Sequence, residues 1–131
     1  MESASLRPLV FLAAAEKEFR GFPRAVMHEM GFRLHRVQLG KEAAGEKPLA
    51  QGTLKGLGIR EISDDFDRDT YRVVYTVKLA NAIYVLHAFK KKSKFDISTP
   101  KHEIDLVKQR YLEAVKLDAA VQSTPAQDGI R

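Results

Sequence analysis

Residues 71–94, YRVVYTVKLANAIYVLHAFKKKSK, constrain the fold more than any other part of the chain. Tyr71, Val73, Tyr75 and Val77 occupy every second position, which is the period of a β-strand with two different faces. Asn81 tolerates the positive φ of a tight turn. Residues 83–89 are then almost all apolar, as in a central strand covered on both faces. The stretch therefore predicts a β-hairpin at the centre of a sheet.

The second predicted strand ends abruptly in a cationic run, formed by Lys90, Lys91, Lys92 and Lys94. A rigid strand that presents several ammonium groups is a suitable platform for a phosphate. The same pattern is also typical of an ordinary solvated strand end. In a hairpin that turns near residues 79–82, positions whose numbers sum to about 161 to 162 lie opposite each other. Arg72 should therefore pair near Phe89 or Lys90, and we expect its guanidinium to share a hollow with the lysines.

The N-terminal third predicts one strand and two helices. Residues 8–12 form a short apolar strand, and residues 13–19 contain strong helix formers. A Gly-Phe-Pro corner at 21–23 separates this helix from a longer one, which ends near Gly40. The longer helix has an apolar stripe at helical spacing, formed by Val26, Met30, Leu34 and Val37.

The remaining segments complete an α+β pattern. Residues 40–58 are rich in glycine and predict a loop, residues 57–62 predict a strand, and the aspartates of 64–69 predict an acidic turn. Residues 95–98 form a connector. Thr99 and Pro100 are a favourable helix start, and the last helix should fray near Ala120. We expect one domain over residues 1–121, with a small antiparallel-rich sheet, an N-terminal helical hairpin and a C-terminal helix, and a disordered tail over 122–131.

Several classes of site lack their required residues. The sequence contains no cysteine, and its four histidines do not have the spacing of metal ligands. The acidic turn lacks the glycine and the terminal glutamate of an EF-hand, and GTLKGLG lacks the order of a nucleotide-binding P-loop. We therefore expect neither a metal nor a cofactor. No apolar run has the length of a transmembrane helix, and no secretory signal pattern is present, so we expect a cytoplasmic protein.

The basic charge points to a polyanionic partner. The chain has 131 residues with a net charge of +5, and its pI is about 9.5. Such a balance favours nucleic acid as a partner, although it does not exclude a protein target.

Five segments carry a resemblance to a known family: LVFLAAAEKEFRGFP, KGLGIREI, DTYRVVYTV, IYVLHAFKKKS and TPKHEIDLVKQR. In this order they resemble the RelE/ParE toxin superfamily, with the phage-related, HigB-type toxins of type II toxin–antitoxin modules as the nearest subgroup. The resemblance extends over residues 8–113. It implies a RelE-like fold, a cognate antitoxin of helix-turn-helix type and, for many members, metal-free cleavage of mRNA on the ribosome.

The nuclease members of the superfamily use the ribose 2′-OH to attack the adjacent phosphate. The resemblance therefore implies an mRNA interferase (an endoribonuclease that inhibits translation), whose catalytic residues would be Arg72, Lys90, Lys91 and His102. It also implies RNA-binding roles for Lys55, Arg60, Lys92 and Lys94. Two alternatives stay open at this point: a toxin of the same fold that binds a protein such as DNA gyrase, and an inactive basic binding module.

Three of these assignments have a structural alternative. Arg72 would stabilise the charged transition state, or it would form an ion pair with an aspartate of the 64–69 turn. His87 lies in an apolar strand, where a hydrogen-bonded core histidine is the more common case than a proton carrier. The better-known nucleases carry a late catalytic tyrosine. In this sequence the late tyrosine is Tyr111, and its helical register predicts that it lies in the core.

Overall fold

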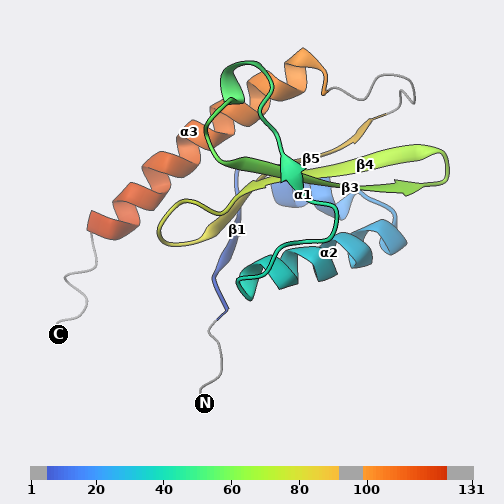
Figure 1. The fold of residues 1–131 in the computed structure, drawn as a ribbon, viewed down its shortest axis with the longest axis horizontal. Coiled ribbons are helices and arrows are strands. Elements are labelled where there is room, and N and C mark those ends of the chain that lie inside the picture. The colour runs from blue at the N-terminus through green and yellow to red at the C-terminus, as the bar shows by residue number, and fades with distance from the viewer. Residues whose placement is uncertain (1–5, 92–98, 124–131) are drawn as a thin grey trace.

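The computed structural model describes residues 6–91 and 99–123. The predicted connector at 95–98, Lys92, Lys94 and residues 124–131 lie outside the described residues. The helices and strands follow one another in the order shown in Figure 1, which is β1 (Leu9–Phe11), α1 (Ala15–Arg20), α2 (Arg24–Gln38), β2 (Lys47–Pro48), the 3-10 helix η1 (Gly52–Leu54), β3 (Ile59–Phe66), β4 (Asp69–Thr76), β5 (Ile83–Lys91) and α3 (Lys101–Ser123).

The five strands form one sheet in the order β1-β5-β4-β3-β2. β3, β4 and β5 are consecutive antiparallel strands, whereas β1 pairs with β5 in parallel. The predicted central hairpin is confirmed, and so is its register, because Arg72 lies opposite Phe89. A bulge interrupts the β4–β5 ladder between Val74 and Tyr75.

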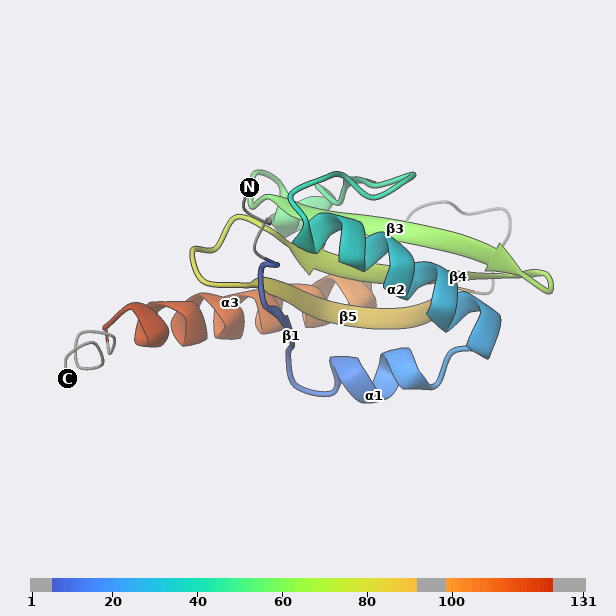
Figure 2. The ribbon, with the colours of Figure 1, turned by 90° about the horizontal axis from the view of Figure 1, so that it is seen from below.

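The sheet separates two apolar cores. α1 and α2 pack on one face, which we call the helical-hairpin face, and α3 and η1 pack on the other, which we call the α3 face. Figure 2 shows α2 in front of the strands and α3 behind them, with the C-terminal end of α3 extending past the sheet. The alternation along β4 explains the division, since Val73 and Tyr75 face α2 whereas Val74 faces α3.

Eight apolar residues of the hairpin and the helices form the centre of the two cores and are buried. They are Val73, Tyr75, Val85 and Phe89 in the hairpin, and Val26, Met30, Leu34 and Val107 on the helices. The stripe predicted for the second helix is the one that α2 buries. α2 begins directly after Pro23 and ends at Gln38, and Gly40 follows with a φ of 86°.

Two segments differ from the predicted pattern. The acidic stretch is not a loop, because β3 continues to Phe66 and only Asp67 and Arg68 form the turn. Both turn residues have positive φ, 51° and 72°, as a two-residue hairpin requires. α3 continues to Ser123, past the predicted fraying point at Ala120. None of the described helices combines the length and apolar character that crossing a membrane requires.

Candidate functional site

The most buried charged pair on the α3 face joins the centres of two neighbouring strands. Arg72 of β4 donates from Nη1 to Oε1 of Glu61 on β3 over 3.1 Å, and the two side chains are 8% and 7% exposed. The alternative partner predicted for Arg72, an aspartate of residues 64–69, was wrong, because the carboxylate that the structure places there is Glu61. A guanidinium held by a carboxylate in a dry environment is fixed in position and keeps its charge.

The start of α3 lies directly over this pair. Thr99 is buried, and its Oγ1 lies 3.4 Å from Nη1 of Arg72. Gln51 holds Thr99 in place through both ends of its amide: Nε2 donates to the Thr99 carbonyl over 2.6 Å, and Oε1 accepts from the Thr99 backbone N–H over 3.1 Å. The Gly-rich loop before β3 and the start of α3 thus close over Arg72 together.

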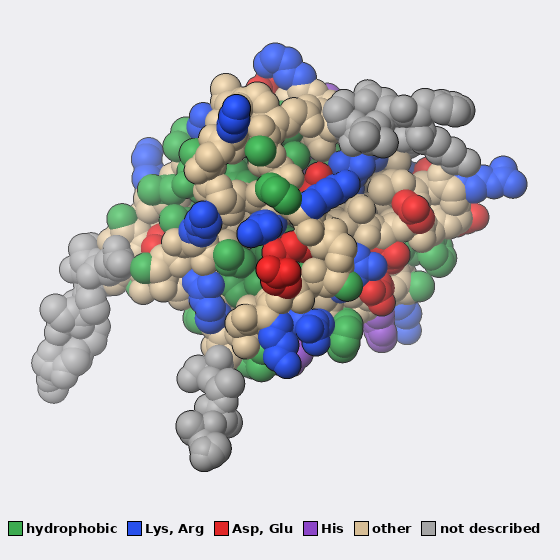
Figure 3. All heavy atoms as spheres, viewed as in Figure 1, with side chains coloured by type: hydrophobic (Ala, Val, Ile, Leu, Met, Phe, Trp, Pro, Cys, Tyr) green, Lys and Arg blue, Asp and Glu red, His purple; other side chains and the backbone are tan. Residues whose placement is uncertain are grey.

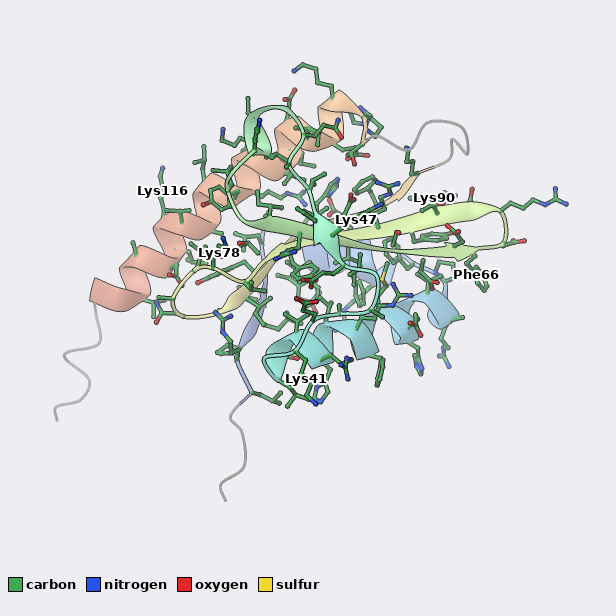
Figure 4. The ribbon with its side chains drawn as sticks, viewed as in Figure 1. Lys41, Lys47, Phe66, Lys78, Lys90 and Lys116 are labelled. Atoms are coloured by element: carbon green, nitrogen blue, oxygen red, sulfur yellow. The ribbon has the colours of Figure 1, made fainter. Side chains whose placement is uncertain are left out.

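The two lysines that end β5 lie on opposite faces of the sheet. Lys91 is opposite Thr70 and points to the same face of the sheet as Arg72, the α3 face, where it is buried. Lys90 is opposite Tyr71 and lines the helical-hairpin face, where its Nζ lies 3.6 Å from Oδ2 of Asp69. The structure therefore brings Lys91 to the side of Arg72 and does not bring Lys90 there. Figure 4 shows Lys90 near the far end of the β4–β5 ribbon.

Lys90 belongs to a different hollow. A cavity of about 470 Å³ opens between α1 and the ends of β4 and β5, with Lys17 and Lys90 among its cations and Phe22 and Tyr71 among its rings. The rings of Phe22 and Tyr71 meet edge to face at 5.0 Å. This hollow is separated from Arg72 by the thickness of the sheet.

The other residues predicted to act on RNA do not gather around Arg72. His102 projects from the first turn of α3, with 79% of its side chain exposed. Lys55 is exposed directly after η1. Arg60 lies on the helical-hairpin face, with its Nη1 3.4 Å from Oε2 of Glu46. Figure 3 shows Lys and Arg side chains distributed around a small acidic group on the face turned to the viewer.

His87 is the centre of a second buried charged cluster. Its Nδ1 lies 2.9 Å from Glu18 of α1, and its Nε2 lies 2.5 Å from Glu103 of α3. Arg110 of α3 donates to both oxygens of Glu18 over 2.8 and 3.0 Å. Burial raises the pKa of Glu18, but its hydrogen bonds to Arg110 and His87 outweigh this effect and hold the pKa below its ordinary range. With both ring nitrogens hydrogen-bonded, His87 connects α1, β5 and α3.

Two buried tyrosines have similar structural roles. The hydroxyl of Tyr84 donates to Asp118 over 2.9 Å, and burial together with this carboxylate raises the pKa of Tyr84 to about 12. Asp118 also accepts the backbone N–H groups of Ala80 and Asn81, which anchors the β4–β5 turn to α3. On the other face, burial and the adjacent Glu46 raise the pKa of Tyr75. Neither phenol is available as an acid near neutral pH.

The site combines two cations with one acid, and the described residues offer no metal-binding arrangement beside it. Within residues 6–91 and 99–123, no group of three or more His, Asp or Glu side chains is placed to hold a metal ion. Arg72 and Lys91 are the two cations on the α3 face of the hairpin, with Glu61 as the neighbouring acid. A guanidinium and an ammonium on one face suit electrostatic stabilisation of a phosphate.

The topology and the arrangement of layers define a RelE-like toxin fold. The free E. coli toxin RelE, solved as a double arginine mutant, has a similar structure: the TM-score is 0.52, with 16% identity over 84% of this chain and 98% of that one. The RelBE2 toxin–antitoxin complex of Mycobacterium tuberculosis aligns with a TM-score of 0.45 and 13% identity, over 71% of this chain and 100% of the matched chain.

The family is established by the sequence. Residues 17–112 match the family described as Phage derived protein Gp49-like (DUF891), and the chain belongs to this family. The resemblance to the RelE/ParE superfamily is thereby confirmed. A comparison with curated proteins gave no match.

Proposed function

We propose that this protein is the toxin of a type II toxin–antitoxin module and that it cleaves mRNA on the ribosome in the cytoplasm without a metal ion. The observation that carries the proposal is the Arg72–Glu61 pair, a guanidinium fixed at the centre of the sheet beside Lys91. Family membership supports the toxin class, and the geometry of this pair supports a phosphate as the group on which it acts.

The proposed reaction is attack of the ribose 2′-oxygen on the adjacent phosphorus, which forms a 2′,3′-cyclic phosphate while the bond from phosphorus to the 5′-oxygen of the next nucleotide breaks. The 2′-OH gives up its proton, and the leaving 5′-oxygen takes one up. The charge that develops on the phosphate oxygens is the part of the transition state that a cationic site stabilises best. Arg72 would contact those oxygens, Glu61 would hold its guanidinium in the required plane, and Lys91 would add positive charge from the same face. Since Arg72 is 8% exposed on its side chain, a substrate would reach it only after the residues that cover it move apart.

The proposal divides the predicted residues into two groups. Arg72 and Lys91 are proposed as the phosphate-binding pair, because they share a face. The predicted residues that lie away from Arg72 are proposed at most as peripheral contacts to RNA or the ribosome. They are Lys90, His102, Lys55 and Arg60. Such contacts would contribute affinity that weakens as salt is raised.

The test is 5′-end mapping of mRNA after induction in a bacterial host. Wild-type protein should produce discrete cuts in coding regions, and these should disappear when translation is blocked. Arg72→Lys keeps the charge but loses the planar fork, so cleavage should fall on the order of a hundredfold. Arg33→Lys is the matched control: Arg33 is 14% exposed and donates to the Ser63 carbonyl from the opposite face.

Two results would contradict the proposal. Full cleavage by folded Arg72→Lys protein would remove Arg72 from the mechanism. Intact mRNA accompanied by a DNA-damage response would instead favour a toxin that acts on DNA gyrase, and intact mRNA without any growth defect would favour an inactive binding module.

A further inference from the structure

The cavity between α1 and the ends of β4 and β5 combines aromatic rings with cations. The rings of Phe22 and Tyr71 meet edge to face at 5.0 Å, and Phe19 contacts Phe22 at 5.8 Å. The volume of about 470 Å³ lies within the range of small-molecule sites, roughly 300–1,000 Å³. We call this cavity the α1 hollow, and its lining includes Lys17, Glu18, Gly21, Phe22, Tyr71 and Lys90.

The outer edge of β5 also lines the α1 hollow, through Ala88 and Lys90. β1 ends at Phe11, opposite Val85, so none of the described strands covers β5 beyond that point. The Ala88 N–H donates to Oε1 of Glu18 over 3.2 Å, which shows that the backbone groups of Ala88 point away from β4. Because this direction alternates along a strand, the Ala88 carbonyl and the Lys90 N–H both point to the open edge. The edge therefore presents one acceptor and one donor, two residues apart.

The charge around the α1 hollow is positive. Lys17 is exposed on α1, and Lys90 is 41% exposed with its Nζ 3.6 Å from Oδ2 of Asp69. Glu18 lines the hollow as well, but Arg110 compensates its charge through hydrogen bonds of 2.8 and 3.0 Å. Two ammonium groups thus face one remaining carboxylate, and ammonium groups form strong hydrogen bonds to phosphate oxygens.

A second hollow on the helical-hairpin face lacks this combination. Its volume is about 260 Å³, and its lining includes the cations Arg7, Lys41 and Arg60 and the acids Glu42 and Glu46. No aromatic side chain of the described residues lines it. This second hollow offers charge without a ring surface, whereas the α1 hollow offers charge, rings and an open strand edge together.

We propose that the α1 hollow is a nucleotide-binding site, in which the base lies against Phe22 and Tyr71 and the phosphate contacts Lys17 and Lys90. Contact with an aromatic ring is available to every base. Adenine fits the strand edge, because its amino group can donate to the Ala88 carbonyl and its neighbouring ring nitrogen can accept from the Lys90 N–H. A free mononucleotide and one nucleotide of an RNA chain share this chemistry. The site does not depend on the proposed cleavage, since the sheet separates it from Arg72.

The test is isothermal titration calorimetry of the full-length protein with AMP, without ribosomes. AMP should bind saturably at one site, and ribose 5-phosphate and adenosine should each bind about tenfold or more weakly, because each lacks one half of the contacts. Phe22→Leu keeps an apolar side chain but removes the ring, so it should weaken AMP and leave ribose 5-phosphate unchanged. Lys17→Gln/Lys90→Gln should weaken AMP about tenfold and leave adenosine unchanged, and this difference from wild type should shrink at high salt.

Lys41→Gln is the matched control, because it removes a positive charge from the second hollow, and its Kd for AMP should equal that of wild type. Gly21→Leu tests the hollow without changing charge. The φ of Gly21 is −82°, and an added Cβ would meet no atom closer than 3.4 Å, so the fold should tolerate the side chain. Since Gly21 lines the hollow, the leucine should narrow it and weaken AMP about tenfold or more. Circular dichroism should show that every variant is folded.

A short oligoadenylate separates the two sources of the nucleotide. An oligomer that displaces AMP and binds more tightly assigns the α1 hollow to RNA, whereas an oligomer that does not displace AMP assigns it to a free mononucleotide, and both results support the site.

Three outcomes would overturn the inference. The first is the absence of saturable binding at millimolar AMP. The second is equal affinity for AMP and ribose 5-phosphate, which would leave only an anion site. The third is wild-type affinity for AMP in both Phe22→Leu and Gly21→Leu, which would place the nucleotide elsewhere on the protein. None of these outcomes bears on mRNA cleavage, so the proposed function and the nucleotide site fail independently.

Discussion

The Arg72–Glu61 pair has a consequence for stability that can be separated from catalysis. Arg72→Met replaces the guanidinium with an apolar chain of similar length and leaves Glu61 in place. Glu61 is 5% exposed, and Arg72 is its ion-pair partner among the described residues. Removing one partner of a buried pair costs about 3–5 kcal/mol, because the remaining charge has lost its compensation. A domain of this size has a total stability of roughly 5–15 kcal/mol, so the loss should be large.

The double variant Arg72→Met/Glu61→Met should recover most of this loss. With both charges removed, the site becomes an apolar contact on the α3 face, and such replacements are often neutral or stabilising. The coupling between the two positions should therefore exceed about 2 kcal/mol. Urea unfolding followed by far-UV circular dichroism measures it. With a slope of about 2 kcal/mol per molar urea, the midpoint of Arg72→Met should fall by roughly 1.5–2.5 M.

The reasoning is refuted if Arg72→Met costs less than about 1 kcal/mol, or if the double variant is as unstable as the single one. The same cycle separates folding from catalysis. A double variant that is stable yet cleaves no mRNA would show that the missing Arg72–Glu61 pair, and not a damaged fold, abolishes activity.

Three further results are expected. Phe89 is buried and stacks on His87 at 4.8 Å, so Phe89→Ala should lower the free energy of unfolding by about 3–5 kcal/mol in the same urea assay. Burial raises the pKa of Glu18 and of Asp118, but their hydrogen bonds outweigh it and leave both pKa values below the ordinary 4.5 and 3.8. A carboxyl group with a lowered pKa stabilises the fold at pH values above its ordinary pKa, so the free energy of unfolding should decrease as the pH falls through and below 4.5 and 3.8. Glu18→Gln should make this decrease smaller in acid unfolding curves. EDTA should leave RNA binding unchanged in a filter assay without ribosomes, and a loss restored by a divalent ion would contradict the metal-free proposal.

The central hairpin could be predicted because its signals are local. Strand alternation from Tyr71 and a turn residue at Asn81 are enough to predict that Arg72 pairs near Phe89 or Lys90. The bulge between Val74 and Tyr75, which sets the observed pairing with Phe89, has no such local signal. The same alternation also contained the information that separates Lys90 from Lys91, since neighbouring residues in a strand point to opposite faces. A single cluster of consecutive lysines is incompatible with this alternation, and the predicted common hollow for Arg72 and Lys90 is therefore wrong.

The partners of the buried charges could not be predicted in this way. Glu18 and His87 are 69 positions apart, and Gln51 and Thr99 are 48 apart. No periodicity connects such residues, because their proximity depends on how α1 and α3 pack against the sheet. Glu61 was missed for a different reason: a charged residue in a strand is usually solvated, and only the position of η1 and α3 over that face makes it buried.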